Sequence, residues 1–287
     1  METNILRLAI QKKGRLADKS LELLKSAGIR IDNYSQQLLI KAQNYDLELL
    51  FIRDDDIPEY VQDGVADIGI VGENVILESE KKLDVIEKLG FGKCRMSIAI
   101  PKADKFNSVK DFEGKNIATS YPKILKNYLA ENKVSSNVHY ISGSVEITPN
   151  INLADAIFDI VSTGSTLKSN GLKEVEIVLK SEAVLVANKN LSEKKKELLE
   201  QILFRTRAVN KAKDNKYILL NAPNEALPNI VKLLPGVKSP TVMPLALEGW
   251  SSVHTVISED DFWGKIENLK SAGAEGILVL PIEKIIA

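Results

Sequence analysis

Short apolar runs alternate with amphipathic stretches along the first ninety residues. The run at 5–10 carries a single charge, and leucines at helical spacing follow it over 18–27. Two more apolar runs, at 47–52 and 66–72, flank a short helix predicted at 57–64, which has a proline in its first turn and a glycine at its end. Strands that alternate with helices in this way predict an α/β domain with a mainly parallel sheet.

The same alternation restarts after residue 93 and predicts a second α/β lobe. The chain would cross between the lobes near residue 95 and again near 180, leaving a cleft of the kind that commonly holds ligands. The elements predicted here are a strand at 94–101, a turn and strand over 107–122, a helix at 122–133, a strand at 138–144, a loop passing into a helix over 147–158, a strand running into a loop over 159–167, a strand over 175–188 and a charged helix at 191–213.

The pattern changes from residue 213 onward, where the predicted order is βαββαβ, a ferredoxin-like module. Ser258 is predicted to cap the second helix of this module, with Asp261 at the third helical position. The VQDGVADIGI stretch at 61–70 resembles the lobes of solute-binding proteins. The expected fold class is therefore α/β, with a two-lobed core like that of periplasmic binding proteins and a C-terminal ferredoxin-like domain.

Composition and charge exclude several classes of function. The 38 Lys and Arg residues are balanced by 39 Asp and Glu residues, so a general electrostatic grip on nucleic acid is not expected. One cysteine excludes an internal disulfide, and two distant histidines argue against a His-rich metal cluster. The N-terminal stretch reads neither as a signal peptide nor as a membrane span, which predicts a cytoplasmic protein without membrane partners.

The most informative stretch is a hydroxyl-rich loop that follows a predicted strand. Such a loop can wrap a phosphate with backbone N–H groups and hydroxyl donors, although an ordinary turn has the same composition. Asp159 precedes the loop and could accept hydrogen bonds from sugar hydroxyls, and Asp155 would lie on the same side if that stretch is helical. The loop consists of Ser162, Thr163, Gly164, Ser165 and Thr166.

Three further segments carry candidate chemistry. QKKGRL places Lys12, Gly14 and Arg15 at the end of the first strand, where open α/β sheets bind ligands, or it is a solvated basic loop. The acids at 54–56 could hold Mg²⁺, or Asp55 or Asp56 could cap the next helix. The pair Ser120 and Tyr121 opens a helix whose free N–H groups could bind an anion and whose tyrosine could stack on a purine, or it is a helix cap.

Taken together, these motifs resemble the long, regulated form of the ATP phosphoribosyltransferase family. The resemblance covers essentially the whole chain, and the segment 143–167 is its most specific part. The matching segments are QKKGRL, RDDDIP, DIGIVGENV, ATSYPKILK, GSVE, LADAIFDIVSTGSTL, DNKYILL, LLPG, SPTVMPLA and GILVLPIEK.

The resemblance implies that adenine N1 of ATP displaces pyrophosphate from phosphoribosyl pyrophosphate, with Mg²⁺ on the pyrophosphate. N1 is a neutral lone-pair nucleophile and needs no strong base. Carried over by motif, the hydroxyl loop would hold the 5-phosphate, and Asp159 with Asp155 the ribose hydroxyls, although Ile160 stands where many phosphoribosyltransferases have a second acid. Asp159 and Arg15 are the catalytic candidates. The candidates for ATP and pyrophosphate contacts are Arg15, Asp67, Glu73, Arg95 and Tyr121, with Lys12, Gly14 and Ser120 in the same motifs.

The resemblance also implies three domains and an oligomer. Catalytic lobe I would comprise 1–95 and 180–212, lobe II 96–179, and a regulatory domain 213–287. L-Histidine would inhibit by binding near Val237, Thr241, Val256 and Gly276, and the family assembles as homodimers and homohexamers. Two alternatives remain open: a solute or effector receptor, and a phosphoribosyltransferase for another base.

Overall fold

The chain folds into two compact units. The computed structural model describes residues 4–32, 37–234 and 236–286. The first unit comprises Met1–Lys25 and Ile29–Glu200, and the second comprises Ser26–Gly28 and Gln201–Ala287. No helix among the described residues combines the length and the apolar character needed to cross a membrane.

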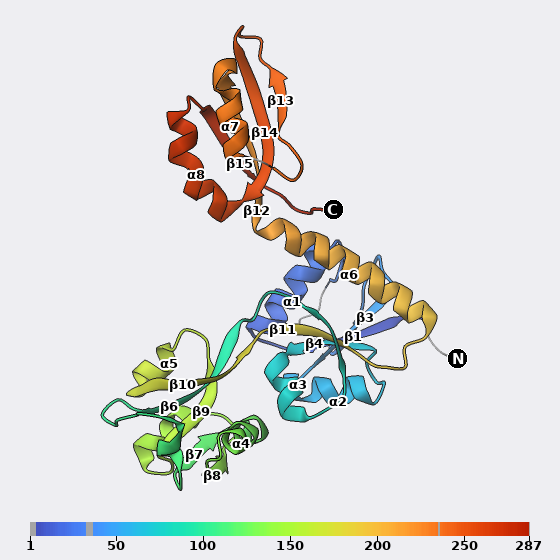
Figure 1. Ribbon diagram of the computed structural model, residues 1–287. Coiled ribbons are helices and arrows are strands. Elements are labelled where there is room, and N and C mark those ends of the chain that lie inside the picture. The colour runs from blue at the N-terminus through green and yellow to red at the C-terminus, as the bar shows by residue number, and fades with distance from the viewer. Residues whose placement is uncertain (1–3, 33–36, 235, 287) are drawn as a thin grey trace. The chain divides into compact units, whose positions relative to one another are not determined.

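The first unit begins with a mixed six-stranded sheet that we call, with its helices, the first lobe (Figure 1). Its helices are α1 (Arg15–Ser26), α2 (Ile57–Gln62) and α3 (Glu73–Ser79). Its strand order is β2-β3-β1-β4-β11-β5, formed by β1 (Leu6–Gln11), β2 (Leu39–Lys41), β3 (Leu47–Ile52), β4 (Ile68–Gly72), β5 (Asp84–Lys88) and β11 (Ala183–Ala187).

The prediction of a mainly parallel sheet is wrong for this lobe. β1 runs parallel to β3 and β4, as the apolar runs indicated. However, β2 is antiparallel to β3, to which a short connection joins it, and β11 is antiparallel to both of its neighbours. β11 returns to this sheet from the second lobe, so its direction depends on a long-range connection that local periodicity does not encode.

The second lobe holds a five-stranded sheet in the order β10-β6-β9-β7-β8. Its strands are β6 (Cys94–Pro101), β7 (Asn116–Thr119), β8 (Asn137–Tyr140), β9 (Ala156–Val161) and β10 (Leu172–Ser181). It also contains the helices α4 (Pro122–Glu131) and α5 (Ser165–Ser169) and the 3-10 helices Val109–Phe112 and Val145–Ile151.

The helix predicted over 147–158 is not formed. Val145–Ile151 is a 3-10 helix, and Ala156 already begins β9, which pairs with both β6 and β7. The side chains of Ala156, Ile157 and Phe158 are fully buried, because the strand lies inside the sheet. A short run that is apolar on both faces is compatible with a buried strand and with a helix. Here the segment is a strand, because it pairs with β6 and β7 inside the sheet.

Two segments connect the lobes and lie side by side. The chain leaves the first lobe after β5 and returns through β10, where Ser181 pairs with Cys94 in the β6–β10 ladder. The backbone N–H of Ala183 donates to the carbonyl of Phe91 at 2.9 Å. The crossings near 95 and 180 therefore form one hydrogen-bonded hinge region between the two sheets.

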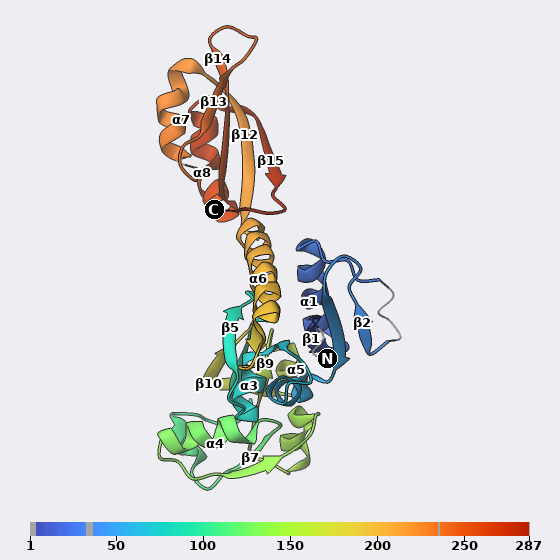
Figure 2. The ribbon, with the colours of Figure 1, turned by 90° about the vertical axis from the view of Figure 1, so that its right-hand side faces the viewer.

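The second unit contains the predicted βαββαβ module. Two helices cover one face of its sheet, where Ile218, Leu220 and Phe262 belong to the buried core (Figure 2). The Ser258 hydroxyl accepts the N–H of Asp261 at 3.1 Å, which confirms the predicted cap. The order β13-β14-β12-β15 is ferredoxin-like, and the elements from residue 193 onward are α6 (Glu193–Lys213), β12 (Asn215–Pro223), α7 (Leu227–Leu233), β13 (Thr241–Pro244), β14 (Trp250–Ser258), α8 (Glu259–Ser271) and β15 (Glu275–Pro281).

Candidate functional site

The first unit contains a cavity of about 650 Å³ between its two sheets, beside the hinge region. The first lobe contributes the end of β1 and the starts of α1 and α3. The second lobe contributes the end of β9, the loop after it and α5. Both lobes therefore present strand ends and helix starts to one space, which is where open α/β sheets bind ligands.

The whole hydroxyl loop lines this cavity. Ser162, Thr163, Gly164, Ser165 and Thr166 all contribute to its wall. Gly164 has φ +78° and precedes the first residue of α5, a left-handed turn that glycine adopts at little cost. The hydroxyls of Thr163 and Ser165 lie 3.1 Å apart. The loop therefore concentrates hydroxyl donors and backbone N–H groups at one end of the cavity.

The guanidinium of Arg95 is bonded to this loop and to Glu174, so it is not free to extend into the cavity. Its Nη1 donates to the carbonyl of Ser162 at 3.1 Å, and its Nε and Nη2 donate to the two oxygens of Glu174 at 2.5 and 2.6 Å. Ser97 adds a hydrogen bond to the same carboxylate at 2.6 Å. Because its guanidinium is held by these partners, Arg95 positions the loop. Arg95 and Ser162 also line an adjoining cavity of about 400 Å³.

Two acids stand beside the loop. Asp159 lies near the end of β9, accepts the N–H of Ile160 at 2.7 Å and lines the cavity. Burial raises the pKa of Asp159 to about 6, and the nearby charge of Glu146 adds to this rise. Glu146 lines the same cavity from the 3-10 helix Val145–Ile151. The cavity therefore offers a pair of carboxylates next to its hydroxyl loop.

The cavity is also lined by basic side chains. Gly14 and Arg15 line the cavity, whereas Lys12 does not. Lys19 also lines it, one helical turn after Arg15 on the same face of α1. Lys93, from the hinge region, lines both cavities. Three basic side chains thus share the cavity with the hydroxyl loop and its acids.

Asp155 lies away from the cavity. Its Oδ2 accepts the N–H of Asn116 at 2.8 Å, and its Oδ1 is 3.7 Å from Nζ of Lys115. The expectation that it shares a side with Asp159 assumed a helix, but these four residues run along an extended segment and span about 13 Å. Glu146, which sequence reasoning missed, stands next to Asp159 instead.

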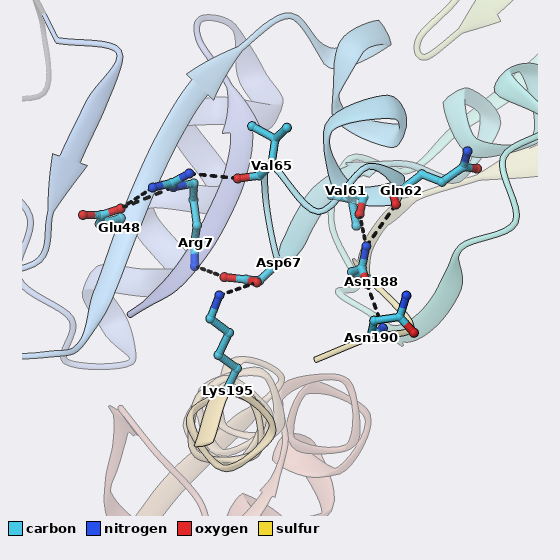
Figure 3. A network of polar contacts seen from close by, with 9 residues as sticks. All are labelled: Arg7, Glu48, Val61, Gln62, Val65, Asp67, Asn188, Asn190 and Lys195. Carbon is cyan, nitrogen blue, oxygen red and sulfur yellow. Dashed lines mark hydrogen bonds and ion pairs between the residues drawn. The ribbon is translucent and has the colours of Figure 1, made fainter. Parts of the chain in front are cut away.

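Asp67 does not line the cavity either, and Figure 3 shows it among its polar partners. Asp67 directly precedes β4. It therefore lies at the opposite end of this strand from the end that leads into α3. Its Oδ2 accepts the N–H of Arg7, and its Oδ1 is bonded to Nζ of Lys195, both at 2.8 Å. These partners make Asp67 part of a structural network. Glu73 lies in the adjoining cavity, where it pairs with Lys88 at 3.0 Å.

The N–H groups that open α4 already have an anion. Glu78, on α3, accepts the N–H of Lys123 through Oε1 and the N–H of Ile124 through Oε2, each at 3.0 Å. The free anion site predicted beside Ser120 and Tyr121 is therefore occupied by a carboxylate of the first lobe. Burial, together with the charge of Asp159, raises the pKa of the half-buried Tyr121, so its hydroxyl stays protonated.

No preformed metal centre is present in the part of the chain that the structure describes: no group of three or more His, Cys, Asp or Glu side chains could hold an ion. Asp54 alone of the three consecutive acids lines the cavity. The helix cap predicted from Asp55 or Asp56 does not form, because these acids make a 3-10 turn and their side chains do not bond the α2 backbone. Burial raises the pKa of Asp55.

The predicted regulatory residues are spread across the second unit. Val237 is exposed and precedes β13, and Thr241 is exposed on β13. Val256 lies on β14, and Gly276 lies on β15 at the other edge of the sheet. Edge strands three positions apart are separated by roughly 14 Å, so one chain does not gather the four residues at a single point.

Sequence comparisons match the chain over nearly its full length. The family model described as ATP phosphoribosyltransferase matches residues 53–208, and that described as the HisG C-terminal domain matches residues 212–284. An ATP phosphoribosyltransferase of Phocaeicola vulgatus is 58% identical over 282 residues, covering 98% of this chain and 100% of the relative. One of Cytophaga hutchinsonii is also 58% identical, over 284 residues, covering 99% of each chain.

A solved structure has the same core. The ATP phosphoribosyl transferase (HisG:HisZ) complex of Thermotoga maritima superposes with a TM-score of 0.61 at 31% identity, covering 71% of this chain and 96% of the other. The first family model and both relatives are described as ATP phosphoribosyltransferases, which favours the transferase over the solute-receptor alternative. With the C-terminal domain also matched, the chain belongs to the ATP phosphoribosyltransferase family, in its long form.

Proposed function

We propose that this protein catalyses the first step of histidine biosynthesis in the cytoplasm: transfer of the phosphoribosyl group of phosphoribosyl pyrophosphate to N1 of ATP, with release of pyrophosphate. The observation that carries the proposal is one cavity lined by a hydroxyl loop, by two carboxylates beside it and by three basic side chains. These groups match the phosphate, the ribose hydroxyls and the two polyphosphates of the substrates.

In this proposal each group has a role in binding. The loop 162–166 donates hydrogen bonds to the 5-phosphate, as helix starts with free N–H groups commonly do. Asp159 and Glu146 accept the ribose hydroxyls. Arg15, Lys19 and Lys93 bind the pyrophosphate and triphosphate groups. Catalysis then comes from holding adenine N1 in line with the anomeric carbon and from stabilising charge on the leaving group.

Charge in the cavity supports a role for Mg²⁺. Three basic side chains face three acidic ones, so the lining has no surplus of positive charge to neutralise two polyphosphates. Mg²⁺ would supply that charge when bound, and it commonly binds substrate phosphates with only one or two protein carboxylates. Asp54, Glu146 and Asp159 are the carboxylates that could reach it.

The decisive experiment is an assay of the purified chain with ATP, phosphoribosyl pyrophosphate and Mg²⁺, following the absorbance of the adduct. We expect turnover, and a panel of other nucleotides should give little. Folded protein without turnover would reject the proposal.

The phosphate loop is tested by the double variant Thr163→Val and Thr166→Val. Valine keeps the shape and removes the hydroxyls, so the KM for phosphoribosyl pyrophosphate should rise about 10-fold or more, for two lost donors at about 1 kcal/mol each. The exposed Thr241 provides the matched control Thr241→Val, which should leave that KM unchanged. An unchanged KM in the double variant would remove the loop from this role.

Regulation and assembly belong to the same proposal. L-Histidine inhibits through the C-terminal domain, at a junction between subunits of a homo-oligomer that ranges from dimer to hexamer. The separation of Thr241 and Gly276 on opposite edges of one sheet supports a site completed by a neighbouring subunit. The boundaries 1–95 with 180–212, 96–179 and 213–287 describe the two lobes and this domain.

A further inference from the structure

The peptide unit that joins Ser162 to Thr163 lies between the main cavity and the adjoining one. Ser162 lines both cavities, whereas Thr163 lines only the main one and Arg95 only the adjoining one. Nη1 of Arg95 donates to the carbonyl of Ser162 at 3.1 Å. The carbonyl of this peptide unit is therefore held on the side of the adjoining cavity.

The direction of the Ser162 carbonyl also sets the direction of the next N–H group. In a trans peptide unit the C=O and N–H bonds point to opposite sides of the chain. The N–H of Thr163 therefore points away from Arg95, on the side of the main cavity. It has no hydrogen-bond partner among the described residues, so it is available to an anion. A reversed peptide unit would present a carbonyl oxygen there, which repels an anion.

Glu174 holds Arg95 in the orientation that reaches this carbonyl. Its two oxygens accept Nε and Nη2 of Arg95 at 2.5 and 2.6 Å, and Oε1 also accepts the hydroxyl of Ser97 at 2.6 Å. The hydrogen bond from Arg95 holds the pKa of Glu174 below its usual range, so the carboxylate is charged. A pair of parallel bonds fixes the plane of a guanidinium, which here leaves Nη1 directed at Ser162.

Two irregularities in β10 bring Glu174 close to Arg95. The β6–β10 ladder shifts register twice between Glu174 and Leu179, each time adding one residue to β10. Glu174 therefore stands opposite Ala99, two positions nearer to Arg95 than it would in a regular ladder, or roughly 7 Å. Extra residues of this kind often occur next to active sites, where they redirect a side chain.

We propose that Glu174 is a positioning residue for the 5-phosphate of phosphoribosyl pyrophosphate, an inference that rests on the proposed function. By fixing Arg95, it keeps the peptide unit between Ser162 and Thr163 in the orientation that offers an N–H to the phosphate. Glu174 lines neither cavity, so it acts through Arg95 rather than by touching the substrate. Its loss should therefore affect the binding of this substrate and not that of ATP.

The first test is Glu174→Gln, which keeps the size of the side chain but removes its charge and one of the two acceptors for Arg95. We expect the KM for phosphoribosyl pyrophosphate to rise about 3- to 10-fold, with kcat and the KM for ATP unchanged. A general structural defect would change all three. Glu176→Gln is the matched control, since Glu176 lies on the same strand, stands opposite Ile98 and lines neither cavity. It should behave like the wild type.

The second test asks whether Glu174 acts through Arg95. Arg95→Lys keeps the positive charge but cannot hold Ser162 and Glu174 with one planar fork, so it should raise the same KM. The double variant with Glu174→Gln should be no worse than the worse single variant, because both changes break one chain of contacts. Additive effects would give Glu174 a separate role and overturn the inference.

A measurement on the wild-type protein needs no variant that must fold. On titration with phosphoribosyl pyrophosphate, the NMR signal of the Thr163 amide should shift, because its N–H then donates to the phosphate. The shift should be smaller in Glu174→Gln. An unmoved Thr163 amide in a protein that turns over both substrates would overturn the inference and leave the proposed function standing. Absence of turnover in the folded wild type would overturn both.

Discussion

The surroundings of Asp159 determine the pKa of its carboxyl group. Asp159 lies in β9, close to the polar loop, and burial raises its pKa to about 6 from the ordinary aspartate value of 3.8. In its proposed role, the ionised carboxylate of Asp159 accepts two sugar hydroxyls. Asp159 would then bind the ribose well at neutral pH and poorly in mild acid.

We predict that binding of phosphoribosyl pyrophosphate weakens as pH falls through about 6. Each further pH unit should raise the KM roughly tenfold, because the ionised fraction of Asp159 falls by that factor. KM measured from pH 8 to pH 5 tests this. Asp159→Asn should have a high KM throughout, without this dependence. A dependence that persists unchanged in the variant would assign the titration to another group.

The raised pKa of Asp159 also predicts how the stability of the protein changes with pH. Between pH 3.8 and about 6 the folded chain binds a proton at Asp159 that the unfolded chain has released. The free energy of unfolding, relative to that of Asp159→Asn, should therefore fall as pH rises through this window. Urea unfolding of both proteins at pH 4, 5 and 6.5 measures it, and a relative stability that rises with pH would contradict the buried state of Asp159.

Single residues also mark where spacing in the sequence was a poor guide. Asp155 was predicted on the same side as Asp159 on the assumption of a helix, whereas the segment is extended and Glu146 lies near Asp159 from a separate segment. The signal that could have found Glu146 was its own motif, GSVE, which carries an acid after a glycine turn. Lys19 was similarly foreseeable from Arg15, one helical turn earlier.

At the level of elements, α3 and α4 are joined by a carboxylate at a helix start. Glu78 accepts two N–H groups of the first turn of α4, although the helices belong to different lobes. This contact satisfies groups that a helix cannot satisfy internally. It also connects the second lobe to the first.

Glu78→Ala should destabilise the start of α4 by about 1 kcal/mol, the usual cost of losing a cap. Hydrogen exchange of the peptide containing Lys123 and Ile124 should become faster by a few-fold. The matched control is Glu80→Gln, since Glu80 only pairs with the exposed Nζ of Lys123, a contact worth little. Equal exchange in the wild type and Glu78→Ala would mean that the cap adds no stability.

The N-terminal cap of α8 is expected to stabilise the second unit. Ser258→Ala removes the hydroxyl that accepts the N–H of Asp261, so the second unit should lose about 1 kcal/mol of stability. Both tryptophans of the chain, Trp250 and Trp263, lie in this unit, so their fluorescence in urea reports on it. Ser271→Ala, at the far end of α8, should leave the midpoint unchanged, and a similar loss in both variants would speak against a specific cap.

For the whole molecule, the division into two units bears on regulation. The boundary drawn by compactness falls inside α6, between Glu200 and Gln201, and the ferredoxin-like strands follow from residue 215. The proposed inhibition by histidine belongs to the second unit. The cavity lined by Arg15 and Asp159 belongs wholly to the first.

Deletion of residues 213–287 should therefore abolish inhibition by histidine while turnover remains. The measurement is the rate of adduct formation with and without histidine, for the full chain and the truncated one, with the melting temperature as the control for folding. Inhibition that persists in a folded, active truncated protein would reject the regulatory role of this module.

The sequence by itself determined the local parts of this protein. The helix α1, the cap at Ser258, the hydroxyl loop after a strand and the βαββαβ order follow from periodicity and from turn residues, which act over a few neighbouring positions. The family resemblance extended this to the whole chain because motifs are preserved as continuous segments.

Only the tertiary structure decided which distant groups meet. It paired Asp67 with Lys195, brought Glu146 to Asp159, placed Glu78 at the start of α4 and reversed β11 in the first sheet. None of these contacts is encoded by spacing, because each joins segments far apart along the chain. They arise when two sheets and the hinge between them pack together, and the cavity left between the sheets is the proposed site of the reaction.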